Sequence, residues 1–320
     1  MDHENTLVTV FGGSGFIGTQ LVQALARRGH RVRVAVRRPD LAGHVRMLGG
    51  VGQVVPVQAN IRDAASVRQA IAGAGAVVNL VGIGFEKGRQ RFAAVNARGA
   101  ATVAEAAREA GVTRLVHMSG LGFEGVEGSG FARSKTAGEE AVLEAFPEAV
   151  IIRPSIVFGP GDGFFNLLGS LARMSPVLPL IGGQSRFQPV HVGDVAEAIA
   201  IAVGGGVPGG RIYELGGPDI ETYRQLTERV LKATGRSNLL LPLPVPVARA
   251  MAMVFSVLPR PLLTGDQITL LQRDNVVSPE AIAEHRTLAA FGILPTSMDA
   301  ILPDYLWRFR RNGQFDRQTS

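Results

Sequence analysis

The chain of 320 residues contains no cysteine. Disulfide bonds, thiolate nucleophiles and cysteine-based zinc sites are therefore excluded. Its six histidines are scattered, and no two of them have the close spacing of a metal-binding motif such as H-E-x-x-H. We therefore expect no metal site.

Lysine is also scarce, since it occurs only at Lys87, Lys135 and Lys232, and most of the positive charge behind the net value of +6 comes from arginine. A basic total can indicate a nucleic acid, an anionic membrane or an acidic partner. The arginines are spread along the chain, with a short basic run at 308–311. No groove-reading or base-stacking motif accompanies them, so we expect a solvated basic surface and no nucleic-acid partner.

The sequence has no apolar run of transmembrane length. The longest candidate, Val245–Leu258, is too short to span a bilayer and contains Arg249. Residues 1–5 are short and acidic, and strand-like sequence follows at once, which is not typical of a signal or transit peptide. We expect neither a transmembrane helix nor a signal peptide.

Strand-like and helix-like segments alternate over the first half of the chain. β-Branched, apolar segments that predict buried parallel strands occur at 6–11, 31–36, 54–58, 76–81, 115–118 and 150–152. Segments with helical spacing stand between them at 16–28, 66–71, 95–109 and 135–144. This alternation predicts an α/β fold with a doubly wound parallel Rossmann sheet.

After Arg153 the regular alternation ends, and proline and glycine cluster in the segments that follow. Helices are predicted at 195–203, 222–234 and 247–258, and one more strand at 212–215. We therefore assign 1–152 to the Rossmann domain, to which 188–215 is expected to add. We assign 153–320 to a smaller, partly interleaved C-terminal cap.

A glycine-rich loop joins the first predicted strand to the first predicted helix. Gly12 allows a tight turn, Gly15 allows the backbone to approach a pyrophosphate, and Gly18 allows close packing of helix and strand. The phosphates would then lie on free N–H groups at the positive end of the helix. A glycine-rich turn without a ligand is the alternative, but the spacing and context favour a dinucleotide. The loop residues assigned to the cofactor are Gly12, Ser14, Gly15, Phe16, Ile17 and Gly18.

The end of the second predicted strand indicates which dinucleotide is bound. An NAD site usually has Asp or Glu here for the ribose 2′-hydroxyl, whereas this chain has Arg37 and Arg38. A guanidinium group suits the 2′-phosphate of NADP because it offers both charge and paired donors. Two solvated surface arginines are the alternative. We expect NADP(H) ahead of NAD(H).

These motifs together resemble those of the extended and atypical short-chain dehydrogenases, the NAD-dependent epimerase/dehydratase group. Segment 12–18 resembles the phosphate loop of that family, 59–63 its adenine-contacting segment, and 79–82 its cofactor wall on the fourth strand. Segment 153–162 is similar to the stretch that passes the nicotinamide, and 190–196 to a late strand-to-helix junction. The resemblance implies further cofactor contacts at Asn60, Ile61, Val81, Gly82, Asn96, Ser119, Lys135, Pro154 and Val157.

Segments 131–139 and 146–159 resemble one branch more closely, the nucleotide-binding accessory subunit of respiratory complex I (NADH:ubiquinone oxidoreductase) and its bacterial relatives. Members of that branch hold NADPH tightly and are regarded as structural rather than catalytic. The resemblance implies complex I subunits as partners and peripheral membrane contact through Val245–Leu258. It also implies a location peripheral to the inner membrane, cytoplasmic in a bacterium or on the matrix side.

The resemblance also implies where catalytic residues would stand. Short-chain dehydrogenases use a Tyr-x-x-x-Lys pair and a Ser or Thr that orients the carbonyl. Lys135 is present, but Phe131 stands four residues before it and has no hydroxyl. The usual Ser or Thr position, two residues after Ser119, is Leu121. We therefore assign no catalytic residue and treat these four positions as vestigial.

Two alternatives to a lost active site remain open. Tyr213 or Tyr223 could take the tyrosine role, although neither is followed by lysine four residues later. Hydride transfer could also proceed without the tyrosine. The favoured function is an NADPH-binding, non-catalytic accessory or assembly subunit of complex I. The alternatives are an NADP-dependent reductase, epimerase or isomerase for a sugar nucleotide, isoprenoid or quinone-like substrate, and a nucleotide-sensing regulator.

Overall fold

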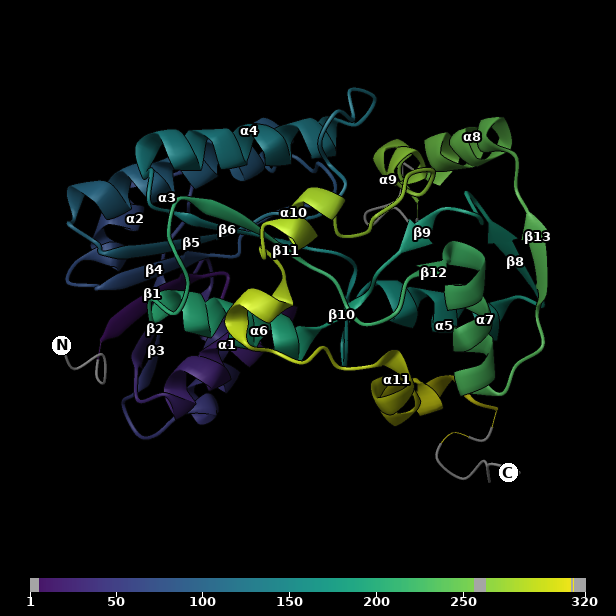
Figure 1. The fold of residues 1–320 in the computed structure, drawn as a ribbon, viewed down its shortest axis with the longest axis horizontal. Helices are drawn as coiled ribbons and strands as arrows, with labels where there is room; N and C mark the ends of the chain where they lie inside the picture. Colours follow the sequence, from purple (N-terminus) through teal and green to yellow (C-terminus); the bar gives the residue numbers. More distant parts are fainter. Residues whose placement is uncertain (1–5, 256–262, 312, 314–320) are drawn as a thin grey trace.

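The computed structural model describes residues 6–255, 263–311 and 313 (Figure 1). Two sequence-based expectations therefore fall partly or wholly outside the described residues. These are the interpretation of residues 1–5 and the end of the predicted contact segment near Leu258. Within the described ranges, no helix is long and apolar enough to cross a membrane.

The centre of the molecule is a sheet of seven parallel strands in the order β11-β6-β5-β4-β1-β2-β3. The strands are β1 (Leu7–Phe11), β2 (Arg31–Val36), β3 (Val54–Gln58), β4 (Ala76–Asn79), β5 (Arg114–Met118), β6 (Val150–Pro154) and β11 (Arg211–Leu215). Every residue of β4 and β6 is buried, as expected for strands covered on both faces. The predicted doubly wound Rossmann sheet is confirmed.

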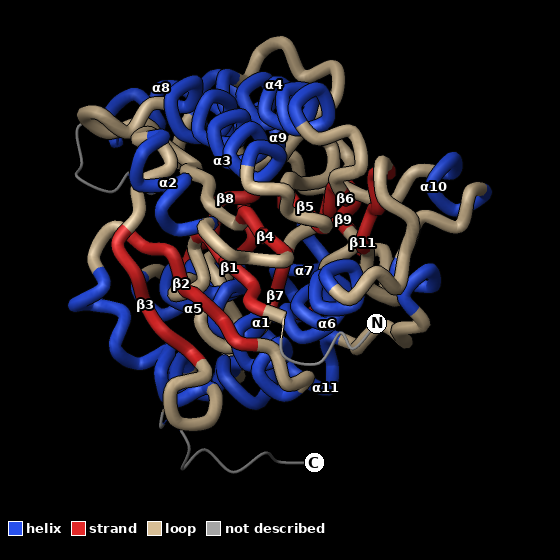
Figure 2. The backbone as a smooth tube through the Cα atoms, turned by 90° about the vertical axis from the view of Figure 1, so that its left-hand side faces the viewer, coloured by secondary structure: helices blue, strands red, loops and turns tan. Residues whose placement is uncertain are grey.

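Helices cover both faces of this sheet (Figures 1 and 2). One layer consists of α1 (Phe16–Arg27) and α6 (Val192–Val203). The other consists of α2 (Ala64–Ile71), α3 (Arg98–Glu109) and α4 (Gly130–Ala145). The apolar stripe predicted for the first helix explains its placement, because Leu21 and Leu25 are fully buried against the strands. Helix α6 packs beside α1 and against β4, β5 and β6, which explains why its apolar residues are nearly all buried.

The chain leaves the sheet after β6 and returns twice. Segment 190–215 supplies α6 and the edge strand β11, whose Ile212 pairs in parallel with Ile151 of β6. Later, α10 (Pro279–Ala283) and the 3₁₀ turn Leu288–Phe291 pack near β11 and α6. The sheet therefore takes its last strand from beyond residue 152, while the domain boundary itself stays a prediction.

The remaining elements form a second lobe, on the right of Figure 1. Its core lies among α5 (Phe164–Met174), α7 (Tyr223–Thr234) and α11 (Met298–Leu306). The other helices are α8 (Val245–Phe255) and α9 (Gly265–Leu270). Short strands form three pairs: β7 (Val157–Phe158) with β10 (Val190–His191), β8 (Val177–Leu180) with β13 (Leu239–Pro242), and β9 (Arg186–Phe187) with β12 (Glu221–Thr222).

The sequence did not predict α5 or these short strand pairs. The helix follows the proline- and glycine-rich segment 154–163, whose turns obscure the periodicity at its start. Two-residue strands such as β9 have too few residues for an alternating pattern to be recognised. Helix α8 begins at Val245, two residues before its predicted start, because Pro246 in the first turn removes no helical hydrogen bond.

Candidate functional site

A cleft of about 740 Å³ opens at the carboxyl edge of the sheet, where the loops after β1, β2, β3 and β4 meet. This edge is where open α/β sheets bind ligands. The predicted cofactor residues that line the cleft are Gly12, Ser14, Gly15, Arg37, Arg38, Asn60, Ile61, Val81 and Gly82. The other predicted residues lie in neighbouring elements: Phe16, Ile17 and Gly18 in α1, Asn96 before α3, Ser119 after β5, Lys135 in α4, Pro154 in β6 and Val157 in β7.

The three loop glycines are required for different reasons. Gly12 has a φ of +81°, and a Cβ at Gly18 would overlap the backbone of Gly12 and Gly13. A Cβ at Gly15 would meet no described atom within 4 Å except the Gly12 carbonyl oxygen at 3.3 Å. The fold therefore requires glycine at the first and last positions, whereas at Gly15 the empty space is what a ligand would use. No described side chain caps α1, so its first N–H groups can bind an anion.

Arginines line the cleft on the side of β2 and β3. Arg37, Arg38 and Arg62 all face it, and no acidic residue is among the described residues that line it. Arg38 also pairs with Asp40 at 2.8 Å, and this hydrogen bond lowers the pKa of the Asp40 carboxyl. Arg62 was not assigned to the site from the sequence, although it directly follows Ile61.

Asn60 holds the loop that follows β3. Its backbone N–H donates to Ser66 Oγ at 3.0 Å, and its Oδ1 accepts from the backbone of Arg62 at 3.2 Å. Ile61 is buried, and a Cβ at Gly99 would lie 2.6 Å from its Cδ1. Asn60 therefore shapes the cleft wall through local turn contacts, while Ile61 packs against α3.

Asn96 holds the loop that follows β4. Its Oδ1 accepts from the Ile83 N–H at 2.9 Å, and its Nδ2 donates to the Ile83 carbonyl at 3.2 Å and to Ser134 Oγ at 3.1 Å. A Cβ at Gly82 would lie 3.7 Å from Asn96 Oδ1 and 3.9 Å from Lys135 Nζ. Gly82, Asn96 and Lys135, which are far apart in the sequence, therefore meet at one end of the cleft.

Lys135 and Ser119 are both buried at this end. Lys135 Nζ donates to the Met118 carbonyl at 2.7 Å, and burial lowers the pKa of the Lys135 ammonium to about 8. Ser119 Oγ has no hydrogen-bond partner among the described residues. Burial, together with the nearby Lys135, holds the pKa of His117 well below its usual range, so that imidazole is neutral. A buried donor beside an unpaired hydroxyl fits a ribose with its own hydroxyl groups.

Residues 8–216 match the NAD dependent epimerase/dehydratase family. The chain belongs to this family. The predicted family resemblance is therefore confirmed, and the cleft lies where proteins with this fold bind nicotinamide dinucleotides.

Relatives in the family extend over nearly the whole chain. A mitochondrial protein of Arabidopsis thaliana, NADH dehydrogenase (ubiquinone) 1 alpha subcomplex subunit 9, is 37% identical over 96% of this chain and 79% of its own length. The mitochondrial NADH-ubiquinone oxidoreductase 40 kDa subunit of Neurospora crassa is 29% identical over 96% of this chain and 80% of its own. An Escherichia coli NADPH-dependent quinone oxidoreductase, solved with NADPH, has the same fold, with a TM-score of 0.71 and 19% identity over 93% of this chain and 98% of its own.

The two positions where the resemblance predicts proton-handling residues lie at a second, apolar cavity of about 360 Å³. Both Leu121 and Phe131 line it. Phe131 packs edge-on between Phe92 and Phe123, with ring centroids 5.7 Å and 5.1 Å apart. None of these side chains can donate or accept a proton.

The two tyrosines considered as replacements for the missing hydroxyl lie in different surroundings. Tyr213 packs in the sheet core against Phe291 and donates to the Pro208 carbonyl at 3.0 Å. Tyr223 lines the apolar cavity, and burial raises the pKa of its phenol to about 12. A phenol that is so hard to ionise is a poor general base near neutral pH.

The cap holds the start of α4, the helix of Phe131 and Lys135. Ser129 caps this helix by accepting from the Ala132 N–H at 3.1 Å. Asp266, from α9, accepts from Ser129 Oγ at 2.6 Å and from the Phe131 N–H at 3.2 Å. The sequence pattern did not single out Asp266, because more than a hundred positions separate it from the residues that it holds.

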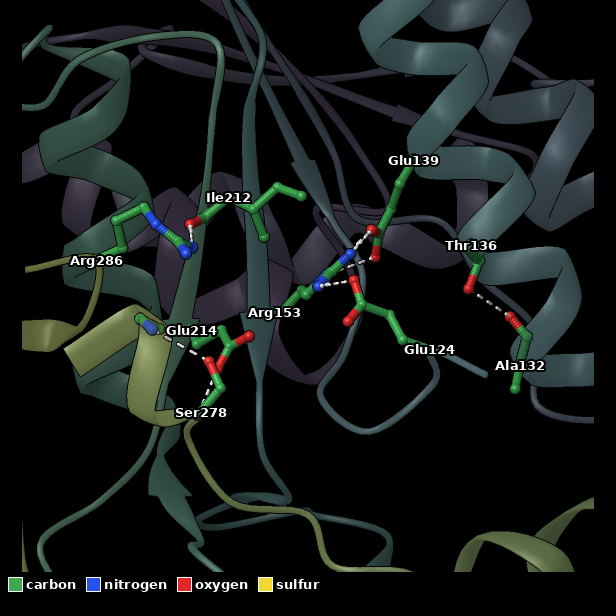
Figure 3. Close-up of polar contacts among 10 residues, drawn as sticks. Glu124, Ala132, Thr136, Glu139, Arg153, Ile212, Glu214, Ser278 and Arg286 are labelled. Atoms are coloured by element: carbon green, nitrogen blue, oxygen red, sulfur yellow. Dashed lines mark hydrogen bonds and ion pairs between the residues drawn. The ribbon is translucent and has the colours of Figure 1, made fainter. Parts of the chain in front are cut away.

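Arg153, which begins the segment assigned to the nicotinamide, points into a polar network instead (Figure 3). Its guanidinium pairs with Glu139 of α4 at 2.5 Å and with Glu124 at 2.6 Å. The side chains of Arg153 and Glu139 are 9% and 5% exposed, so loss of Arg153 would leave the buried Glu139 carboxylate without this partner. The pair joins β6 to α4 and anchors the loop that contains Leu121 and Glu124.

Proposed function

We propose that this protein is an NADPH-binding, non-catalytic accessory or assembly subunit of a complex I type NADH:ubiquinone oxidoreductase. One observation supports this most directly. Gly12 and Gly15 line the cleft and Lys135 lies at its end, while Leu121 and Phe131 stand where the resemblance places the proton-handling residues. The relatives that are named as complex I subunits align over nearly the whole chain, which supports the same assignment.

The proposed cofactor is NADP(H) rather than NAD(H). Three arginines and no carboxylate line the adenosine side of the cleft, in the part of the chain that the structure describes. The 2′-phosphate would lie on Arg37 and Arg38, and the pyrophosphate on the N–H groups around Gly15. Lys135 and Ser119 would hold the nicotinamide ribose. The bound nucleotide can supply a hydride, but Leu121 and Phe131, which stand where the resemblance places the proton-handling residues, cannot supply the matching proton.

The proposed location is peripheral to the inner membrane, on the cytoplasmic or matrix side. Helix α8 offers a candidate contact surface for complex I subunits or the bilayer. Ala248 and Ala252 face the cap, whereas Val247 and Val254 are 47% and 68% exposed. Exposed apolar side chains on one helix are typical of surfaces that dock against a partner.

Gentle purification of the protein from its native membranes tests the main proposal. We expect NADPH and complex I subunits to co-purify with it at near-stoichiometric amounts. A Gly15→Val variant should fold, because the protein leaves space there, but lose NADPH, because the side chain fills the pyrophosphate site. A protein that purifies alone would refute the accessory role, and a Gly15→Val variant that retains NADPH would refute the phosphate-loop assignment.

Calorimetry with both nucleotides tests the cofactor preference. Arg37→Asp should weaken NADPH binding by about a hundredfold and NADH binding much less, because a carboxylate repels the 2′-phosphate. Arg38→Asp should have a smaller effect, since Arg38 also pairs with Asp40. Equal affinity of the wild type for NADPH and NADH would contradict the proposal.

An NADP-dependent enzyme is the second candidate, and the apolar cavity beside Phe131 is the observation that favours it. Such a cavity suits an isoprenoid or quinone-like acceptor better than a sugar nucleotide. Steady NADPH oxidation with a soluble ubiquinone analogue that is lost in Lys135→Ala would establish the enzyme. We expect no steady oxidation in the wild type.

A further inference from the structure

The apolar cavity is a built binding site in its own right. Its wall is formed by the end of β6, by four residues of α5 and by other residues of the cap. Among its apolar lining residues are Phe131, Ile156, Phe164, Leu167, Leu168 and Ile181. Its volume of about 360 Å³ is within the range of small-molecule sites. Water is poorly stabilised in an apolar cavity, because it finds few hydrogen-bond partners there.

Most of the polar groups in its wall already have protein partners. Ser155 Oγ donates to Asn275 Oδ1 at 2.6 Å, and Asn275 Nδ2 donates to the Leu121 carbonyl at 2.7 Å. Asp274 pairs with Arg186 at 2.6 Å. These contacts fix the shape of the wall and leave few groups able to bind a polar ligand.

Among the wall residues whose polar side-chain groups lack such a partner, Arg273 is exposed to solvent and Tyr223 is buried. The Tyr223 side chain lines the cavity and the residue is 8% exposed, but its hydroxyl has no hydrogen-bond partner among the described residues. Its ring is fixed edge-on against Phe164 and Phe187, with centroids 5.9 Å and 6.3 Å away. Burial raises the pKa of the phenol to about 12, so the group is neutral and can donate. The hydroxyl can therefore donate a hydrogen bond to a ligand oxygen in the cavity.

We propose that this cavity binds an uncharged amphiphile with an alkyl or isoprenoid chain, whose carbonyl oxygen accepts a hydrogen bond from Tyr223. This goes beyond the proposed accessory function, because it requires neither turnover nor assembly with other subunits. The chain occupies the apolar space along α5. The polar residues Gln267 and Arg273 line the same cavity and are exposed, so a polar group outside the apolar space can remain in water.

The wall chemistry selects against other ligand classes. A sugar nucleotide carries many hydroxyl and phosphate oxygens, which the leucine and phenylalanine side chains of α5 would leave unpaired. A pure hydrocarbon would fill the volume but leave Tyr223 unsatisfied. A chain with one buried carbonyl satisfies both conditions, whether it comes from an isoprenoid quinone or from an acyl lipid.

Equilibrium dialysis of the full-length protein, with NADPH present, tests the proposal with three probes: decylubiquinone, dodecanamide and dodecane. We expect saturable one-to-one binding of at least one carbonyl probe. Tighter binding of decylubiquinone identifies the quinone source, and tighter binding of dodecanamide the acyl source. Tyr223→Phe should weaken the binding of the carbonyl probe about fivefold, as expected for the loss of one neutral hydrogen bond, and leave the binding of dodecane unchanged.

A filling substitution provides the second variant. Leu167→Trp should abolish binding of all three probes, because the larger ring occupies the cavity. Leu294→Trp, at a residue that is 91% exposed, is the matched control and should bind as the wild type does. Absence of saturable binding by both carbonyl probes would overturn the proposal, as would binding that Leu167→Trp leaves intact. Retention of NADPH, measured in the same samples, separates this outcome from failure of the accessory function.

Discussion

At the scale of single residues, Lys135 combines burial with a charge. The side chain is held at the end of the cofactor cleft, and burial lowers the pKa of its ammonium from 10.5 to about 8, although Glu139 partly offsets this. Burial thus penalises the charged form in the folded protein. A buried ammonium group at this end of the cleft is a donor that suits the hydroxyl groups of a ribose.

This lowered pKa predicts how stability depends on pH. Between pH 8 and 10.5 the unfolded chain holds a proton on this lysine that the folded protein has released, so stability rises with pH over that window. Below pH 8 both states hold the proton, and burial of the charged Lys135 lowers the free energy of unfolding by an amount on the order of 3 kcal/mol. In nucleotide-free protein, Lys135→Met should therefore be more stable than the wild type at pH 7, and the difference should shrink towards pH 10.5.

Urea unfolding at several pH values measures this difference. Lys232→Met, which replaces an exposed lysine, is the control. Its free energy of unfolding should differ from that of the wild type by the same amount at every pH. Parallel pH profiles for Lys135→Met and the wild type would contradict the argument.

At the scale of elements, α8 shows how a short apolar helix divides its faces. The sequence shows apolar residues on nearly every side, so its pattern could not tell core from surface. In the structure, Ala248 and Ala252 pack against Ile181 and Ile268, while Val254 on another face is 68% exposed. Small residues at the contact let the helix lie close to the cap.

Two glutamate substitutions separate the faces of α8. Ala248→Glu should destabilise the protein by about 3 kcal/mol or more, because an unpaired carboxylate would be buried. Val254→Glu should change stability by less than about 0.5 kcal/mol, yet reduce association with complex I or membranes. Urea unfolding and co-sedimentation measure the two effects. Unchanged co-sedimentation of Val254→Glu would exclude this face as the contact.

At the scale of the whole molecule, the sheet and the cap are interleaved. The chain passes between them several times, and Asp194 of α6 accepts from the backbone of Thr296 at 2.7 Å and from its hydroxyl at 2.9 Å. The Asp266 contacts at the start of α4 join the lobes on the other side. Neither lobe is a continuous piece of chain, so we expect them to unfold together.

Removal of the nucleotide should therefore lower the melting temperature of a single transition in which both lobes unfold. A ligand at a hundred times its Kd raises the free energy of unfolding by about 2.7 kcal/mol. For a protein of this size, that corresponds to a rise in the melting temperature of roughly 5 °C. Calorimetry with and without NADPH measures the shift. Two transitions, of which NADPH moves only one, would show that the lobes unfold independently.

The sequence by itself determined the features that depend on local pattern. The alternation of strands and helices predicted the sheet, and the spacing of Gly12, Gly15 and Gly18 predicted the phosphate loop. The resemblance to the short-chain dehydrogenases, and not the spacing alone, implied that Leu121 and Phe131 stand at the acid–base positions beside Lys135. The sheet and the loop follow from residues close together in the chain, whose periodicity or spacing is fixed by helix and strand geometry.

Only the tertiary structure decided which distant residues meet. It paired Arg153 with Glu139, placed Asp266 at the start of α4, and brought Tyr223 to the wall of the apolar cavity. It also decided which side of α8 is buried. These contacts join segments that are separate in sequence, and side-chain burial and charge pairing depend on how those segments pack, which no local pattern records.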